Sequence, residues 1–168
     1  MKRRIVLLLL FVGSMTMMAQ SESKTSVIKA ERWMASGTCS FGFDDGGMHT
    51  RSFSMRSGYE VLPNFKPFLN LETQIGLYHK GMKKDYYNTA NIGLGANYSI
   101  IPQIEVHGLV GTSLGNLGWK YHVWEAGFTI GFRHKSSQTI GFGYRYVHSK
   151  TDGIADYKGP FISIGYNL

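Results

Sequence analysis

The sequence predicts an all-β fold: an eight-stranded antiparallel transmembrane β-barrel in up-and-down meander order, preceded by a signal peptide. Between Glu31 and Leu168, apolar and polar residues alternate in eight successive stretches. Side chains on a strand point alternately to opposite faces, so this period of two indicates strands with two chemically different faces. Each stretch has about ten residues, the length at which a tilted strand crosses the hydrocarbon core of a bilayer. A secretion signal precedes the stretches.

Residues 1–20 have the layout of a secretory signal peptide, with a basic run at 2–4 and an apolar run at 5–12. The apolar run is shorter than the roughly 20 residues of a transmembrane helix. Removing this leader lowers the formal net charge from +7 to about +4, which weakens a nucleic-acid interpretation. We therefore expect residues 21–30 to be a periplasmic lead-in and residues 31–168 to form the barrel domain.

The first three strands are expected at residues 31–43, 51–61 and 68–78. In the first, odd positions are mainly large or apolar and even positions small or polar. Aspartate and glycine at 44–47 mark the loop that follows. Two prolines in 62–67 mark the second turn, because proline removes a donor from the strand ladder. The third strand places alternate residues on one apolar face: Leu69, Leu71, Thr73, Ile75 and Leu77.

The remaining strands follow the same period. The fourth comes after a basic loop at 79–85, and the fifth is the least regular because Leu109 falls on its polar face. The last three alternate aromatic or aliphatic residues with glycine, threonine and charged residues, and the chain ends inside the final strand. These five strands are expected at residues 86–100, 104–114, 121–133, 138–148 and 160–168.

The apolar face is the one expected to meet lipid. A soluble barrel of lipocalin type would place lysine and glutamate on its outer face, but no lysine lies within the predicted strands after the first begins. Eight strands enclose only enough room for side chains, which disfavours a diffusion pore. We expect ionisable residues of the polar face to pair and fill the lumen: Arg56, Glu60, Glu72, Glu105, His107, Glu125 and Arg145.

On its leader, its eight alternating segments and its terminal strand 161–168, the chain resembles the small outer-membrane β-barrel proteins of Gram-negative bacteria, the OmpA/OmpX-like type. The resemblance implies location in the outer membrane, insertion by the barrel assembly machinery, and contact with outer-membrane lipid and lipopolysaccharide. We expect a monomer without nucleic acid, cofactor or metal. The resemblance implies no single activity, since this fold hosts anchors, adhesins and enzymes alike.

A second, local resemblance lies near the C-terminus, where the sequence is similar to the motif of outer-membrane lipid A deacylases. Those barrels cut an acyl ester with a histidine, a serine two residues on and a later acid. His148 matches the histidine, but Lys150 stands at the serine position. Ser149 is adjacent and, if the strand persists, points to the other side. An acid is available only if the next loop folds back, so the hydrolase candidates are His148, Ser149, Asp152 and Asp156.

The loops predicted to face outward are rich in lysine, which can contact lipopolysaccharide phosphates. The candidates are Lys80, Lys83, Lys84, Lys120, Lys150 and Lys158. The sequence therefore predicts a non-enzymatic outer-membrane protein with an envelope-structural or surface-interaction role. Two alternatives stay open: a lipid A acyl-ester hydrolase or a non-catalytic relative of one, and a narrow channel.

Overall fold

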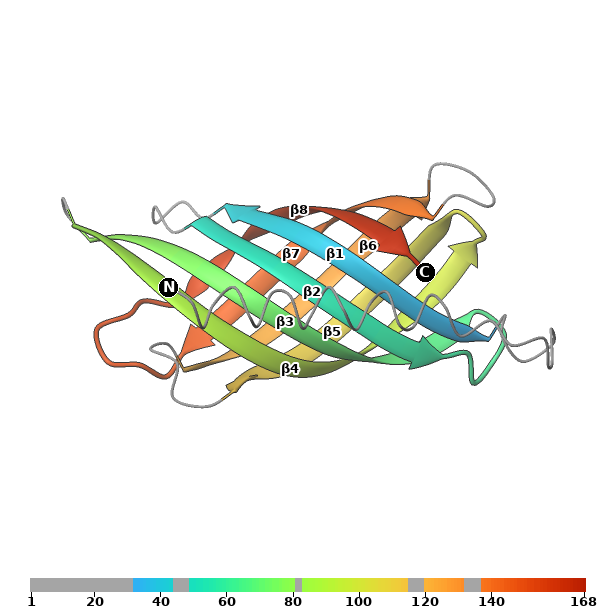
Figure 1. Cartoon of the computed structure of the whole chain (residues 1–168), viewed down its shortest axis with the longest axis horizontal. Coiled ribbons are helices and arrows are strands. Elements are labelled where there is room, and N and C mark those ends of the chain that lie inside the picture. The colour runs from blue at the N-terminus through green and yellow to red at the C-terminus, as the bar shows by residue number, and fades with distance from the viewer. Residues whose placement is uncertain (1–31, 44–48, 81–82, 115–119, 132–136) are drawn as a thin grey trace, which may run out of the picture. The chain divides into compact units, whose positions relative to one another are not determined.

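The computed structural model describes residues 32–43, 49–80, 83–114, 120–131 and 137–168. Eight antiparallel strands in sequence order close into a barrel, in which β8 pairs back onto β1 (Figure 1). The fold class is confirmed. The predicted leader and lead-in lie outside the described residues. The strands are β1 Trp33–Phe43, β2 His49–Tyr59, β3 Phe65–Lys80, β4 Lys83–Ile101, β5 Ile104–Leu114, β6 Tyr121–Gly131, β7 Gln138–Ser149 and β8 Tyr157–Asn167.

The two faces of the barrel wall differ as the alternation predicts. Large apolar side chains on the outside are exposed, Leu94 and Ile164 by more than half, while polar side chains on the inside, such as Asn70 and Gln74, are almost fully buried. A soluble protein has the reverse arrangement, and an exposed apolar band over a polar interior is typical of a transmembrane barrel. Separately, the described residues contain no helix long and apolar enough to cross a membrane.

One predicted loop is wrong. Within the basic segment 79–85, residues 79–80 and 83–85 belong to strands, because the β3–β4 ladder continues to the pair Lys80 with Lys83. Beyond a bilayer core, a strand no longer needs one apolar face, so polar residues can extend the ladder into water. The expectation of lysine-free strands is wrong for the same segment, and also for Lys66 in β3 and Lys158 in β8.

Two prolines lie inside strands, where the sequence predicts a turn or a strand start. Pro67 pairs with Ala96 of β4, but it lies beyond the last β2–β3 pair, which joins Gly58 and Phe68. Pro160 pairs with Tyr144 of β7 and lies beyond the last β1–β8 pair. Each proline therefore has a partner strand on one side only, where a missing N–H does not break a ladder.

The two ends of the barrel are distinct. We call the end where β1 begins and β8 ends the terminal end, and the opposite end the distal end (Figure 1). Inside the distal half, Tyr121, Val123, Val147 and Tyr157 form a small apolar cluster that packs with Ile154. Leu109, the residue that breaks the alternation of β5, is also buried in the lumen. The interior of the distal half thus holds an apolar cluster beside buried polar side chains such as Gln74 and Asn91, and the middle is charged.

Candidate functional site

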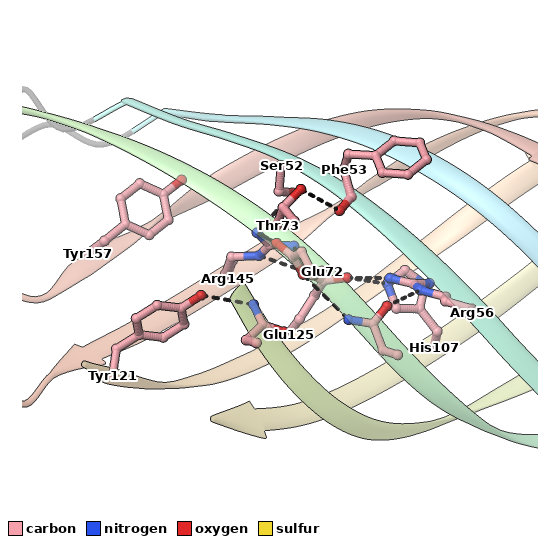
Figure 2. Close-up of polar contacts among 12 residues, drawn as sticks. Ser52, Phe53, Arg56, Glu72, Thr73, His107, Tyr121, Glu125, Arg145 and Tyr157 are labelled. Atoms are coloured by element: carbon pink, nitrogen blue, oxygen red, sulfur yellow. Dashed lines mark hydrogen bonds and ion pairs between the residues drawn. The ribbon is translucent and has the colours of Figure 1, made fainter. Parts of the chain in front are cut away.

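A charged cluster fills the middle of the lumen. It joins five side chains from five strands, namely Arg56 of β2, Glu72 of β3, His107 of β5, Glu125 of β6 and Arg145 of β7 (Figure 2). All five come from inward-facing positions of the alternation, and their inward direction follows from the strand pleat. We call these five residues the lumen network.

Glu125 is the centre of the lumen network. Its Oε1 accepts a hydrogen bond of 2.8 Å from Arg56 Nη2 and lies 3.0 Å from His107 Nε2. Its Oε2 accepts a hydrogen bond of 2.8 Å from Arg145 Nε and a second one from Arg145 Nη2. The Glu125 side chain has no exposed surface. A buried carboxylate is stable only when cations and donors surround it, and here it has three such neighbours.

Arg145 links Glu125 to the other buried carboxylate. Its Nη1 donates to Glu72 Oε1 at 2.7 Å and to Ser52 Oγ at 3.4 Å. Its guanidinium carbon also lies 5.5 Å from the ring centre of Phe161, and that of Arg56 lies 5.0 Å from the ring centre of Phe68. Both arginines therefore combine ion pairs with a cation–π contact in a site shielded from water.

The other two residues expected in the lumen lie apart from this network. Glu105 belongs to a partly exposed contact toward the terminal end, where Lys66 Nζ lies 3.1 Å and Ser99 Oγ 3.0 Å from its Oε1. Glu60 lies just past the end of β2, and among the contacts described for the barrel none joins its side chain to the lumen network. An enclosed polar space of about 20 Å³ lies between these levels, large enough for about one water molecule.

Sequence reasoning overlooked the two phenylalanine rings of the lumen. Phe68 and Phe161 occupy inward positions of their strands, so the alternation itself contained the signal. Each ring lies where a facing glycine has no side chain: Gly95 beside Phe68 and Gly143 beside Phe161. A Cβ at either glycine would collide with the ring, so glycine and phenylalanine here form matched pairs.

The outward face of the distal end holds a second cluster, around Asp156. Tyr146 Oη donates to Asp156 Oδ2 at 2.7 Å, and His148 Nδ1 lies 3.1 Å from the same oxygen. The backbone N–H of Ser149 donates to Oδ1 at 2.8 Å. The loop after β7 thus folds back and brings Asp156 to His148. We call Tyr146, His148 and Asp156 the rim cluster.

The other hydrolase candidates do not join the rim cluster. Ser149 follows His148 in β7, so its side chain points to the opposite face, and its Oγ donates to the carbonyl of Thr151 at 3.3 Å. Asp152 is exposed in the loop. At Lys150, the serine position of the motif, the backbone N–H donates to the Lys120 carbonyl at 2.7 Å. In the described part of the rim, Asp156 therefore pairs with His148, while the side chain of Ser149 lies on the other face of the strand.

Electrostatics make the rim cluster sensitive to acid. Partial burial would raise the pKa of Asp156, but hydrogen bonds with His148, Tyr146 and the Ser149 backbone outweigh burial and hold that pKa below its ordinary value. A carboxyl group whose pKa is lower in the folded protein than in the unfolded chain stabilises the folded state at any pH above its unfolded pKa. This stabilisation is lost as the pH falls through the pKa of the folded state. The rim cluster is therefore held together at neutral pH.

We expect the hydrogen-exchange protection of the Ser149 amide to fall by about two- to fivefold once the pH is low enough to protonate Asp156, whose lowered pKa moves this change below the usual aspartate range. The measurement is amide exchange in detergent micelles, expressed as a protection factor so that the intrinsic pH dependence cancels. The variant Asp156→Asn should show low protection at every pH. A wild-type protection factor that is no higher at pH 6 than that of Asp156→Asn would show that Asp156 does not hold this loop.

The lysines expected to meet lipopolysaccharide divide into two groups. Lys120, Lys150 and Lys158 are exposed near the rim cluster. Lys80, Lys83 and Lys84 belong to the distal ends of β3 and β4. Among the described residues, no group of three or more His, Cys, Asp or Glu side chains has an arrangement that could hold a metal ion.

Comparisons with known proteins place this chain by fold. No protein-family model and no curated protein matches the sequence. A de novo designed transmembrane β-barrel is similar in structure with a TM-score of 0.56 and 14% identity, over 80% of this chain and 95% of that one. The attachment invasion locus protein Ail of Yersinia pestis is similar with a TM-score of 0.52 and 16% identity, over 82% of this chain and 99% of Ail. The chain thus has the fold of small transmembrane barrels.

Proposed function

We propose that this chain is a non-enzymatic outer-membrane protein of a Gram-negative bacterium, with an envelope-structural or surface-interaction role. The observation that carries the proposal is the closed barrel with an exposed apolar wall and a lumen filled by ion pairs. Such a wall is stable only in lipid. A lumen occupied by the lumen network and by the apolar cluster around Tyr121 argues against the narrow channel, because these buried side chains take up space that a water path would need.

The proposed function also includes how the chain reaches the outer membrane and which end of the barrel faces outward. Residues 1–20 act as the leader that is removed, and the final strand ending near Leu168 is read by the barrel assembly machinery. The terminal end faces the periplasm, and the distal end, with Lys120, Lys150 and Lys158, faces the outer-leaflet lipopolysaccharide. The protein acts as a monomer. Its structural neighbour Ail is named for attachment and invasion, which supports a surface role.

Cell fractionation and gel mobility test the outer-membrane location. The full chain, expressed in a Gram-negative host, should partition with the outer membrane and migrate faster on a detergent gel when it is not boiled, since a folded barrel resists unfolding by detergent. A protease added to intact cells should cleave only distal loops. Recovery in the soluble fraction, or a mobility that boiling does not change, would overturn the proposal.

A second candidate is the lipid A acyl-ester hydrolase, favoured by the contact between His148 and Asp156. The orientation of Ser149 and the presence of Lys150 argue against it, because the base has no hydroxyl beside it at the motif's serine position. Mass spectrometry of lipid A from cells with and without the protein decides between the two. We expect identical acylation. An acyl chain that is lost with the wild type and kept with His148→Ala would establish the hydrolase.

A further inference from the structure

Two histidines face each other across neighbouring strands at the distal rim. His122 of β6 pairs directly with His148 of β7. Both side chains point outward, because the adjacent residues Val123 and Val147 are buried in the lumen. Directly opposed residues of an antiparallel pair have Cβ atoms about 4.5–5.5 Å apart. We call these two residues the histidine pair. Spacing along the chain does not reveal the pair, since only the register of β6 and β7 brings the two residues together.

His148 is already held in the manner of a metal ligand. Its Nδ1 lies 3.1 Å from Asp156 Oδ2, and the Tyr146 ring stacks on its imidazole with centroids 6.5 Å apart. An ionised carboxylate only accepts hydrogen bonds, so the proton of the neutral ring lies on Nδ1 and Nε2 keeps its lone pair. Histidines that bind a metal usually donate their other ring N–H to a carboxylate, a backbone carbonyl or water.

Asp156 is suited to orienting His148 rather than to binding an ion itself. Its Oδ2 accepts a hydrogen bond of 2.7 Å from Tyr146 Oη, and its Oδ1 accepts one of 2.8 Å from the Ser149 backbone N–H. Direct coordination would have to break these contacts. The histidine pair therefore supplies two protein ligands, which agrees with the absence of three-residue metal groups in the described part of the chain.

The nitrogen atoms of the histidine pair that could bind an ion are not engaged elsewhere in the described barrel. Within the described residues, His148 Nε2 makes no hydrogen bond, and neither ring nitrogen of His122 makes one. The His148 side chain is 49% exposed, so an ion in water can reach it. His122 is partly exposed, and its ring meets Trp124 edge-on with centroids 6.1 Å apart. That single ring contact leaves His122 free to turn toward β7.

We propose that the histidine pair binds one divalent transition-metal ion, of the Zn²⁺, Cu²⁺ or Ni²⁺ type, with Asp156 as the positioning residue. Neutral imidazole suits these ions, whereas Mg²⁺ and Ca²⁺ prefer oxygen ligands. Two nitrogens on one tetrahedral ion lie about 3.4 Å apart, a separation that directly opposed side chains can reach. Water fills the remaining positions, so the ion exchanges with the medium at the distal end. The site does not depend on the outer-membrane location proposed above.

Isothermal titration calorimetry tests the site. The full chain without an affinity tag is refolded in detergent micelles and titrated with Zn²⁺, Cu²⁺ or Mg²⁺ alone. We expect one Zn²⁺ per chain, tighter binding of one Cu²⁺ and no binding of Mg²⁺. His122→Ala and His148→Ala should each weaken Zn²⁺ binding at least about tenfold, because each removes one of two protein ligands. Asp156→Asn should weaken it by about 10- to 100-fold while the stoichiometry stays at one ion.

The matched control is His49→Ala. His49 is also an exposed histidine at the distal end of the wall, but its strand partners are Phe43 and Leu77 rather than a histidine. His49→Ala should bind Zn²⁺ like the wild type. Equal affinity in the wild type and in the double variant His122→Ala with His148→Ala would overturn the inference, and so would equal weakening by His49→Ala. Heat-dependent gel mobility of each variant separates failure of this site from failure of the barrel proposal.

A second measurement needs no histidine variant. Cu²⁺ quenches the fluorescence of a tryptophan in its immediate neighbourhood, and Trp124 adjoins His122. One equivalent of Cu²⁺ should therefore quench part of the emission of the wild type. Zn²⁺ in excess should reverse the quenching, and Trp124→Phe should abolish it. Emission that Cu²⁺ leaves unchanged, or quenching that persists in Trp124→Phe, would contradict binding at the histidine pair.

Discussion

Replacing Glu125 with glutamine should destabilise the folded barrel by about 3–5 kcal/mol, the largest effect expected for a single polar substitution in this chain. The substitution removes the negative charge that Arg56 and Arg145 share, so that Glu72 alone faces two cations in a mostly buried site. Burying one uncompensated charge costs several kcal/mol, whereas the intact ion pairs add only modest net stability. Urea unfolding in detergent micelles, followed by tryptophan fluorescence, measures the loss.

Two further glutamates provide matched controls for Glu125→Gln. Glu72→Gln should cost less, because it removes a partner from Arg145 alone, and Arg145 keeps its ion pair with Glu125. Glu105→Gln should cost about 1 kcal/mol or less, because Glu105 and its partner Lys66 are both about one quarter exposed and water screens their contact. The expected order is Glu125, Glu72, Glu105. Equal losses at Glu125 and Glu105 would show that the lumen is hydrated and that the lumen network is not a sealed plug.

The alternation of each strand assigns the five residues of the lumen network to the inner face, but it does not predict their partners. Period two places Glu125 and Arg56 on inner faces, and both are buried. Their contact joins strands 69 residues apart in the sequence, because closure of the barrel puts β2 across from β6. Which inner residues meet across the lumen depends on the stagger and diameter of the barrel, and those are properties of all eight strands together.

Features outside the alternating core were harder to predict. Polar residues at 79–85 look like a loop because composition alone does not distinguish a strand in water from a turn. The contact of Asp156 with His148 depends on how the loop after β7 folds back, and no local pattern encodes that.

Phe161→Ala should destabilise the barrel by about 3–5 kcal/mol, close to the cost of uncovering the charge of Arg145. The ring is only 5% exposed, lies 5.5 Å from the Arg145 guanidinium and fills the space that Gly143 leaves empty. Its removal opens a cavity and also takes away the cation–π contact, and the closed barrel wall cannot collapse inward to fill the gap. Urea unfolding of the refolded full chain measures the change.

The matched control for Phe161→Ala lies on the other face of the same wall. Phe142 is outward, 39% exposed, and stacked on Phe128 with ring centroids 5.6 Å apart. Phe142→Ala should cost only about 1 kcal/mol, the value of one aromatic pair, because lipid or detergent tails replace the lost ring. Truncating a phenylalanine thus lowers the free energy of unfolding more on the inner face than on the outer face. Lipid or detergent can fill the vacated space on the outer face alone. Equal losses would mean that the inner face is also accessible to solvent or detergent, which a lumen sealed by Arg145 and Phe161 does not allow.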